Sequence, residues 1–473
     1  MPDEARVAPA PLGVVAPDTA PRRELAAWVG LAVGALGIAG LFALLLAMSR
    51  VPGIESVVPW PLAFFGKGLV IHVVFSFVVW FLAVFGALAS LASERLAPRR
   101  PLPGLGLAAV AGGALALPLL FVPALLDRGE PTLNNYVPVI IDPLYYAGLG
   151  LLAGSIGCGA VRLLSSARAA SLRRDGIAAA IASAALVYLL ALVCFGLALR
   201  ASAGAPLSHD SNEALIWGGG HLLQFVNTLL LVAAWGLLAA PFVGRLPTRA
   251  LAFSIGLLLL GAIPAPAFYF LFPPFSPEQT QAFTWLQYVL GPAAAIMAVA
   301  LAGRIRRPWP WHDATFLALA LSVMLFAAGG ALGLFVDGAD TRTPAHYHGV
   351  VAGVTLAFFG LFFSRFLPLL GRAIADRRRL RLILHLFAWG QLAACVGLFV
   401  AGGHGAPRKV AGDAQGLVDL APMIGMGLNG LGGLVAVGGG ILFVWTVASA
   451  LLRATDEDNS PAQKTCGDRR RTG

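Results

Sequence analysis

Long apolar runs alternate with short polar segments along nearly the whole chain. A helix needs about 20 apolar residues to cross the hydrocarbon core of a bilayer, so runs of this length predict membrane-spanning helices. Twelve runs qualify, at residues 25–48, 62–92, 105–126, 141–163, 177–199, 214–242, 249–273, 282–302, 313–336, 344–370, 381–402 and 419–451. The pattern predicts an all-α membrane protein, a bundle of about twelve transmembrane helices that forms one domain at residues 25–452.

The polar segments between these runs alternate in charge. Every second segment is basic, and the basic residues are Arg22, Arg23, Arg95, Arg99, Arg100, Arg162, Arg168, Arg173, Arg174, Arg245, Arg249, Arg304, Arg306, Arg307, Arg372, Arg377, Arg378, Arg379 and Arg469 to Arg471. Because basic loops stay on the cytoplasmic side, both termini are predicted to be cytoplasmic, as in a bacterial inner-membrane protein. Residues 1–24 and 453–473 are predicted to be disordered cytoplasmic tails.

Composition and charge support this prediction. The chain is 58% hydrophobic and 12% charged, with a mean hydropathy of +0.81, which excludes an ordinary soluble domain. The net charge of +10 is explained by loops that set topology and meet anionic lipid, so no nucleic-acid partner is expected. Four cysteines, Cys158, Cys194, Cys395 and Cys466, follow no pairing pattern and are expected to fill space.

Four of the eight histidines lie in the second, sixth and tenth predicted spans: His72, His221, His346 and His348. All are in even-numbered spans, which enter from the extracytoplasmic face, so at 1.5 Å per residue their imidazoles are expected within the outer ~15 Å of the bilayer. At about 100° per residue, His346 and His348 point to nearly opposite faces of their helix. Each of the two can therefore serve a different centre.

Three explanations compete for imidazoles in this position. A lone intramembrane histidine usually hydrogen-bonds a neighbouring helix, but four at a shared depth argue against that for all of them. Zinc sites usually add cysteine or carboxylate ligands at close spacing, and no acidic residue accompanies these histidines within the spans. Haem iron needs one or two imidazoles per centre and suits a bundle rich in Phe and Leu, so haem is favoured.

The loop after the eleventh span departs from the charge pattern. It reads Gly405-Ala406-Pro407-Arg408-Lys409 and places two cations on the cation-poor side. Such a pair is usually solvated, but beside a layer of haems it could bind the propionates.

The order of these motifs resembles a known family. A histidine in the second span, Trp217-Gly218-Gly219-Gly220-His221 in the sixth, His346-Tyr347-His348 in the tenth and the Gly405–Lys409 loop occur together. The chain thereby resembles subunit I of the haem-copper oxidases, including cytochrome c oxidase and its nitric oxide reductase relatives. The resemblance covers roughly residues 25–452.

This resemblance implies two haems and a role for each polar residue singled out above. His72 and His348 would be the axial ligands of a low-spin haem. His346 would be the proximal ligand of a high-spin haem, and His221 would bind a second metal, copper or non-haem iron, which makes these two the catalytic residues. Arg408 and Lys409 would meet the propionates.

The chain also departs from the family pattern. In the seventh span the corresponding stretch, residues 264–272, has no counterpart of the adjacent His-His pair that completes the copper site. Phe225 stands where oxidases place a tyrosine, and Leu222 and Leu223 stand where nitric oxide reductases place a glutamate. A second metal is therefore either absent or held by other ligands. Tyr269 could replace the missing tyrosine, although a core aromatic residue is the commoner interpretation.

The resemblance implies an oxidoreductase of respiratory electron transport. Electrons from an external cytochrome c or cupredoxin-like donor would reach the low-spin haem and then the high-spin haem, which would reduce oxygen or nitric oxide, and a second oxidase-type subunit would be a partner. The missing histidine pair leaves open a non-catalytic dihaem electron conduit or gas sensor. A twelve-span secondary transporter is a third class, but it would show repeat symmetry between halves and midplane polar or charged residues at broken helices, and the sequence shows neither.

Overall fold

The computed structural model describes residues 19–49, 64–97, 102–336, 338–410 and 412–453. Within these residues twelve helical stretches are long and apolar enough to cross a membrane, which confirms the predicted all-α membrane fold. The elements in chain order are α1 (Ala20–Ser49), α4 (Phe65–Val73), η1 (Val74–Val79), α5 (Trp80–Leu96), α6 (Pro103–Leu125), β1 (Glu130–Thr132), β2 (Val139–Ile141), α7 (Pro143–Ser166), α8 (Ala169–Arg174), α9 (Gly176–Ala201), α10 (His209–Ala239), α11 (Thr248–Ala262), η2 (Ala265–Ala267), α12 (Phe268–Leu271), α13 (Pro277–Leu286), η3 (Gln287–Val289), α14 (Leu290–Ala302), α15 (Ala314–Leu332), η4 (Gly333–Phe335), α16 (Arg342–Leu361), η5 (Phe362–Phe366), α17 (Leu367–Leu369), α18 (Arg377–Gly403), η6 (Gly412–Gln415) and α19 (Leu420–Leu452). Of these, η1 and η5 are π-helical.

The helices begin and end close to the predicted positions, with two informative differences. The sixth span starts at His209 rather than at residue 214, because Ser208 and Ser211 form a capping box that extends the helix. The seventh span was expected to be continuous over residues 249–273, but its α-helix stops at Ala262 and a short η2 precedes α12. Pro264 and Pro266 cause the break, since proline has no N–H for the helical ladder.

Two predictions fall on the termini of the chain. The predicted tails overlap residues 1–18 and 454–473, which lie outside the described residues, as does Cys466. The other three cysteines are unpaired.

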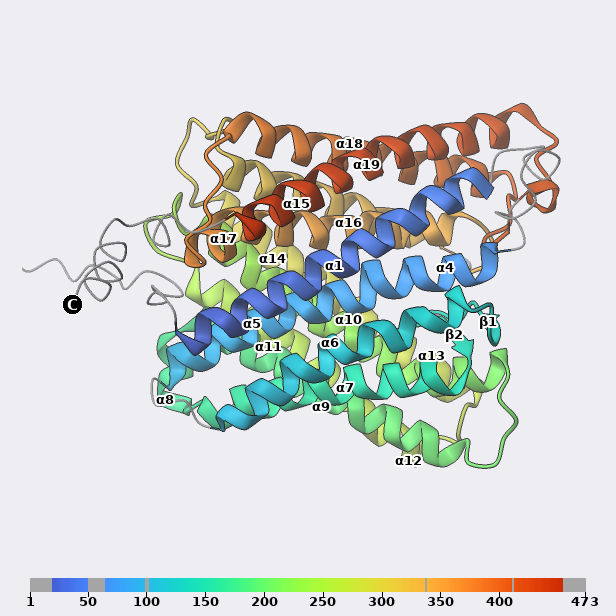
Figure 1. Ribbon diagram of the computed structural model, residues 1–473, viewed down its shortest axis with the longest axis horizontal. Coiled ribbons are helices and arrows are strands. Elements are labelled where there is room, and N and C mark those ends of the chain that lie inside the picture. Colours follow the sequence, from blue (N-terminus) through green and yellow to red (C-terminus); the bar gives the residue numbers. More distant parts are fainter. Residues whose placement is uncertain (1–18, 50–63, 98–101, 337, 411, 454–473) are drawn as a thin grey trace, which may run out of the picture.

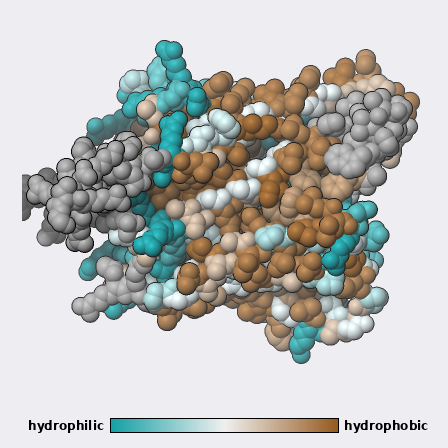
Figure 2. All heavy atoms as spheres, in the orientation of Figure 1, coloured by the Kyte–Doolittle hydropathy of each residue, from teal (hydrophilic) through white to brown (hydrophobic). Residues whose placement is uncertain are grey.

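The bundle has two polar ends separated by an apolar belt. α1 begins and α19 ends at the same end, and we call it the arginine end (Figure 1). The antiparallel hairpin of β1 and β2 lies at the opposite end, which we call the hairpin end. Figure 2 shows hydrophilic side chains at both ends and hydrophobic ones between them. Which end faces the cytoplasm stays a prediction of the loop charges.

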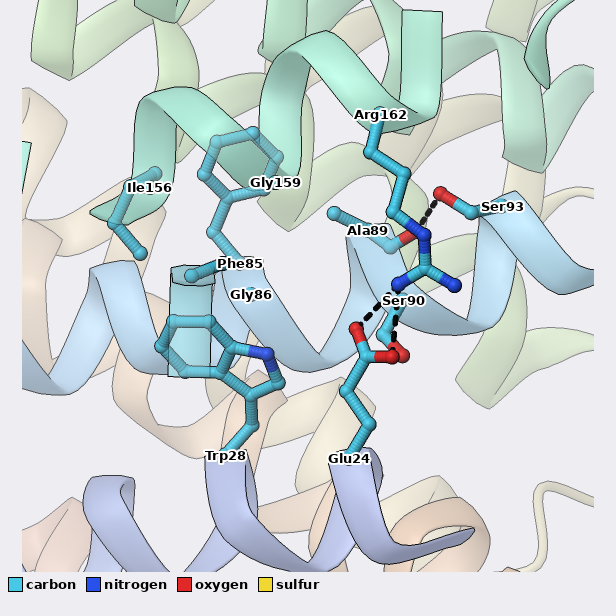
Figure 3. Close-up of a pocket in the computed structure, with 11 residues that line it drawn as sticks. Glu24, Trp28, Phe85, Gly86, Ala89, Ser90, Ser93, Ile156, Gly159 and Arg162 are labelled. Carbon is cyan, nitrogen blue, oxygen red and sulfur yellow. Dashed lines mark hydrogen bonds and ion pairs between the residues drawn. The ribbon is translucent and has the colours of Figure 1, made fainter. Parts of the chain in front are cut away.

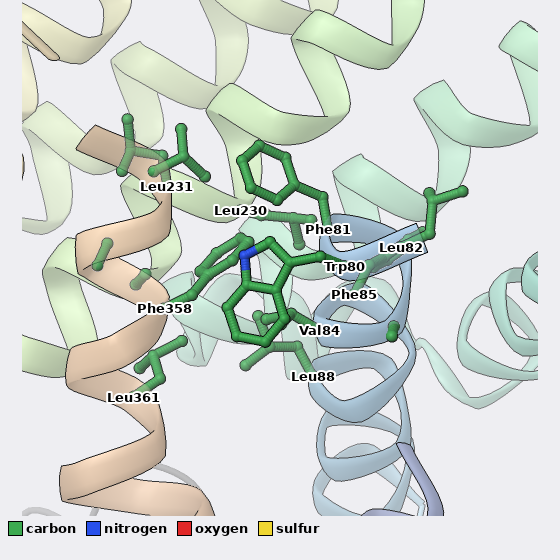
Figure 4. Packing of buried hydrophobic residues seen from close by; sticks show 14 of the residues in the cluster. Trp80, Phe81, Leu82, Val84, Phe85, Leu88, Leu230, Leu231, Phe358 and Leu361 are labelled. Carbon is green, nitrogen blue, oxygen red and sulfur yellow. The ribbon is translucent and has the colours of Figure 1, made fainter. Parts of the chain in front are cut away.

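Aromatic side chains from distant helices meet in the core of the bundle. Trp80 on α5 is fully buried, and its ring centroid lies 6.3 Å from that of Phe358 and 5.3 Å from that of Phe362. Figure 4 shows Trp80 reaching from its helix toward Phe358, with leucines of α10 beside them. α10 itself is buried along most of its length, as expected for a helix that is apolar all around. This core fixes α5, α10 and α16 relative to one another.

Charged side chains at the arginine end form a buried ion cluster. Arg162 on α7 is 3% exposed, and its Nη1 donates to Glu24 at 2.6 Å while its Nη2 donates to Glu94 at 3.0 Å. Figure 3 shows Arg162 and Glu24 reaching toward each other, and both line a small cavity together with Trp28 and Phe85. The cluster ties together α1, α5 and α7, and each charge has an opposite charge beside it, as burial in a low-dielectric region requires.

Candidate functional site

His72 lies on α4, near the hairpin end. Its Nδ1 is 3.0 Å from the main-chain oxygen of Ala39 on α1. A carbonyl oxygen can only accept, so Nδ1 carries the proton and Nε2 is the acceptor nitrogen. Metal-ligating histidines commonly show this arrangement, in which a carbonyl fixes the ring and its tautomer.

His346 on α16 has the same arrangement with a different partner. Its Nδ1 lies 2.7 Å from the main-chain oxygen of Gly329 on α15. The contact depends on small residues: a Cβ at Gly329 would lie 2.4 Å from the Val350 nitrogen, and one at Gly333 would lie 2.6 Å from Nδ1 of His346. The close approach of α15 and α16 thus places a carbonyl at the imidazole.

His348 lies two residues after His346 on α16, and its ring stacks on that of Tyr347 with centroids 5.3 Å apart. The ring contact between Phe358 and Trp80 gives a common reference point on the two helices. His348 lies ten residues before Phe358, and His72 lies eight residues before Trp80. Both helices run from the hairpin end to the arginine end, so at 1.5 Å per residue the two imidazoles are about 15 and 12 Å above that contact. The structure therefore places His72 and His348 at nearly one level.

A similar measure relates His221 to His346. Gly360 on α16 lies against Leu238 on α10, because a Cβ at Gly360 would be 2.9 Å from a methyl of that leucine. His346 is fourteen residues before Gly360, and His221 is seventeen residues before Leu238. Along the helix axes, His346 is therefore about 21 Å from Gly360 and His221 about 26 Å from Leu238, so the two histidines also lie close to one level.

His221 has protein partners at both of its ring nitrogens. Nδ1 is 2.7 Å from the main-chain oxygen of Trp217, and Nε2 is 3.1 Å from the hydroxyl of Tyr136. The side chain is 1% exposed. The rings of Trp217, Tyr136 and Phe283 surround it, with centroids 4.8, 4.7 and 5.9 Å away.

Tyr136 comes from the loop between β1 and β2 and is held from several sides. Its backbone has a φ of 63°, in the left-handed region that a bulky residue rarely adopts. Gln287 Nε2 donates to its hydroxyl at 3.0 Å. Burial raises the pKa of the Tyr136 hydroxyl, with a smaller raising effect from Glu213 and an opposing effect from the Gln287 hydrogen bond. The phenol therefore stays protonated and is available as a donor to His221.

The residue before Tyr136 anchors this loop to α10. The main-chain N–H of Asn135 donates to one carboxylate oxygen of Glu213 at 2.9 Å, and its side-chain amide donates to the other at 2.6 Å. Asn134 adds a third donor to Glu213 at 3.1 Å. Three hydrogen bonds on one carboxylate fix the loop over the start of α10.

Arg408 and Lys409 hold the same loop from the opposite side. Arg408 Nη2 donates to the side-chain oxygen of Asn135 at 3.2 Å, and Lys409 Nζ donates to the main-chain oxygen of Leu133. The pKa of Lys409 is lowered to about 8, chiefly by burial and also by Arg408, while Glu213 opposes both. Arginine has five N–H donors, so one bond to Asn135 leaves others for an anion. The role of both residues as propionate partners stays a prediction.

The broken seventh span brings an aromatic residue toward α10. Tyr269 lies against Gly218, where a Cβ would be 2.4 Å from its hydroxyl, and its ring is 5.6 Å from Phe283. Phe283 therefore lies between Tyr269 and His221. Phe225 is fully buried against Gly261 of α11. These contacts are those of core aromatic residues.

The ring nitrogens of these histidines can be compared with what haem iron and a second metal require. His72 and His346 have Nδ1 fixed on carbonyls and Nε2 in the acceptor form, which fits haem iron. A second metal does not fit at His221, because Tyr136 already uses its Nε2 lone pair. Among the described residues, no group of three or more His, Cys, Asp or Glu side chains could hold a metal ion.

The family model for cytochrome c and quinol oxidase polypeptide I matches residues 25–429, most of the chain. The chain belongs to this family. The resemblance drawn from the four histidines is thereby confirmed. The protein is an integral membrane, oxidase-like subunit, and membership of the family implies haem cofactors, an oxidoreductase character, and work with other subunits and redox donors.

Three relatives illustrate which proteins the chain is similar to. A protein of Rickettsia prowazekii, described only as uncharacterised, is 25% identical over 89% of this chain and 94% of its own. An uncharacterised protein of Aquifex aeolicus is 29% identical over 71% of this chain and 83% of its own. Cytochrome c oxidase subunit 1 of Thermus thermophilus is 33% identical, over 32% of this chain and 30% of its own.

One solved structure extends the likeness to three dimensions. A haem-copper terminal oxidase dimer determined by cryo-EM matches with a TM-score of 0.76, over 93% of this chain and 85% of the other. The sequences are 15% identical, so this likeness shows the fold alone.

Four residues of the site were missed by sequence reasoning: Tyr136, Asn135, Glu213 and Gln287. They lie in loops or at helix ends, where no apolar period marks them. One signal was present in the three glycines before His221. A Cβ at Gly220 would lie 2.7 Å from the Tyr136 ring, so the glycine is needed for that approach.

Proposed function

We propose that the protein is a haem-containing membrane oxidoreductase that takes electrons from an external donor through a low-spin haem and delivers them to a high-spin haem. The haems would supply the redox couples and the iron at which oxygen or nitric oxide is reduced. The single observation that carries the proposal is the pair of imidazoles, His72 and His346, whose Nδ1 atoms are fixed on carbonyls of neighbouring helices.

The residues of the chain have separate tasks in this proposal. His72 and His348, at one level on α4 and α16, would hold the low-spin haem between them. His346 would hold the high-spin haem on the other face of α16. The carbonyls of Ala39 and Gly329 keep the rings oriented. Arg408 and Lys409 would neutralise propionates from the hairpin end.

The donor would dock at the hairpin end, which we assign to the extracytoplasmic side of a bacterial inner membrane. Acidic side chains are exposed there: that of Asp127 is 88% exposed and that of Asp210 is fully exposed. A basic cytochrome c or cupredoxin-like protein would be attracted to such a surface. A second oxidase-type subunit is a further proposed partner.

A second candidate is a non-catalytic dihaem conduit or gas sensor. The hydrogen bond from Tyr136 to His221 favours it, because this bond occupies the nitrogen that a second metal would need.

Spectra of the purified protein test the proposal. We expect two haems in the reduced-minus-oxidised spectrum, and one of them should bind carbon monoxide. A colourless protein from cells with ample haem would refute both candidates. Steady consumption of oxygen or nitric oxide with a reduced donor would select the enzyme, and two haems without turnover would select the conduit or sensor.

A further inference from the structure

Both nitrogens of the His221 ring are committed to protein partners. Since the Trp217 carbonyl can only accept, the proton of His221 is on Nδ1 and the lone pair is on Nε2. The Tyr136 hydroxyl, 3.1 Å away, donates to that lone pair. The phenol thus uses the one position on the ring that could coordinate a metal.

The position of Tyr136 is built into the fold. Gln287, on η3, contacts its hydroxyl at 3.0 Å, and Glu213, on α10, holds the preceding residue by two hydrogen bonds. The left-handed backbone of Tyr136 adds a local strain that these contacts must hold in place. Strained residues held in this way cluster at functional sites.

Within the part of the chain that the structure describes, no cluster of His, Cys, Asp or Glu side chains joins His221 as metal ligands. Trp217 and Phe283 close two sides of the ring with apolar faces. The seventh span, which faces α10 through Tyr269, contains no histidine in residues 264–272. One imidazole alone holds copper or non-haem iron weakly.

We propose that the Tyr136 hydroxyl takes the place of a second metal beside His221, so that haem iron is the single metal of the gas-binding site. Tyr136 is a positioning residue: it fixes the His221 ring and closes its Nε2 to copper and non-haem iron. This inference rests on the proposed function for the presence of the haems, and it adds the metal content of the site.

Metal analysis of the intact protein tests the inference. The wild type and the His221→Ala variant are produced with ample haem, copper and iron, incubated with copper and freed of excess metal. Copper and non-haem iron are then counted against haem. We expect wild type and variant to carry the same low copper and non-haem iron, well below one per protein. A stoichiometric third metal in the wild type that disappears in His221→Ala overturns the inference.

A second measurement follows the hydrogen bond itself. In protein labelled with ¹⁵N-histidine, the Nε2 signal of His221 is identified by its loss in His221→Ala. We expect Tyr136→Phe to move this signal toward that of an unbonded nitrogen. The matched variant Tyr146→Phe, which removes a hydroxyl bonded to Asn212 at 2.9 Å, should leave it in place. A signal that ignores Tyr136→Phe contradicts the inference.

The two proposals fail in different ways. Protein without haem in every preparation refutes the proposed function. Protein with two haems and a third metal bound by His221 refutes this inference alone.

Discussion

At the arginine end a buried arginine is held as a full charge between two carboxylates, whereas toward the hairpin end three histidines are held as neutral rings on carbonyls. Arg162 lies between two carboxylates and joins three helices. His72, His221 and His346 each bind a main-chain oxygen through Nδ1. An ion cluster can be replaced only as a whole, since one orphaned charge is costly. An imidazole whose Nδ1 is bonded to a carbonyl keeps Nε2 as an acceptor, which can bind a metal or accept a hydrogen bond.

The difference predicts that substitution of the histidines changes cofactor content, and that substitution of Arg162 changes stability. The following experiments test this difference and the loop that holds Tyr136, from the largest expected effect to the smallest.

Substitution of His346 should have the largest effect. We expect His346→Ala to abolish the carbon monoxide difference spectrum, because no other described imidazole is fixed on Gly329. His209→Ala is the matched control, since that ring is exposed and contacts Asp210. A carbon monoxide spectrum that survives in His346→Ala would remove this residue from the site.

Loss of His72 should remove the other haem. We expect His72→Ala to lose about half of the haem while carbon monoxide binding persists, since two axial imidazoles hold a low-spin haem. His348→Ala should reproduce the spectrum of His72→Ala. The control is His385→Ala, whose exposed ring contacts Trp389. Haem content equal to wild type in both variants would contradict the pairing.

Replacement of Arg162 tests the arginine end. Arg162→Met leaves Glu24 and Glu94 without their cation, and we expect a loss of about 3 kcal/mol in the free energy of unfolding, because both carboxylates are partly exposed and partly relieved by water. Thermal unfolding in detergent measures it. Adding Glu24→Gln and Glu94→Gln should restore part of the loss. A changed ratio of haem to protein before unfolding would break the division between the two ends.

Insertion of a methyl group at Gly220 should have a smaller effect. A Cβ there meets the Tyr136 ring at 2.7 Å, so Gly220→Ala should displace the loop and cost about 1–3 kcal/mol. Gly196→Ala is the control, since a Cβ at that position meets nothing within 4 Å. Equal melting temperatures for the two variants would show that the loop can shift without a loss of stability.

The smallest effect concerns Lys409. Its pKa in the folded protein, about 8, is below the usual 10.5, so the folded state releases the proton first and stability should rise as the pH increases from 8 toward 10.5. Glu213 and Arg408 are the charges that face it. The melting temperature of wild type minus that of Lys409→Met should therefore increase over this window. A constant difference would show that the amine is not buried as described.

The sequence predicted the parts of the molecule that repeat a simple rule. Apolar runs gave twelve spans within a few residues, because a bilayer requires length and hydrophobicity alone. The order of His72, His221 and His346 gave the family. Apart from the glycines before His221, nothing in the sequence marks Tyr136, since a three-residue strand and a left-handed turn leave no period. It is held by Gln287 and, through the neighbouring Asn135, by Glu213. The break after Ala262 was visible as two prolines but was read as a continuous helix.

The π-helical segment Val74–Val79 stands between His72 and Trp80. Such a segment holds an extra residue that its wider turn takes up, so the helix before and after it keeps nearly the same rotation about its axis. Deleting a single residue there would leave a regular α-helix in which His72 still points to its present face. The segment can therefore lose one residue without turning the imidazole away or altering the aromatic contacts of Trp80.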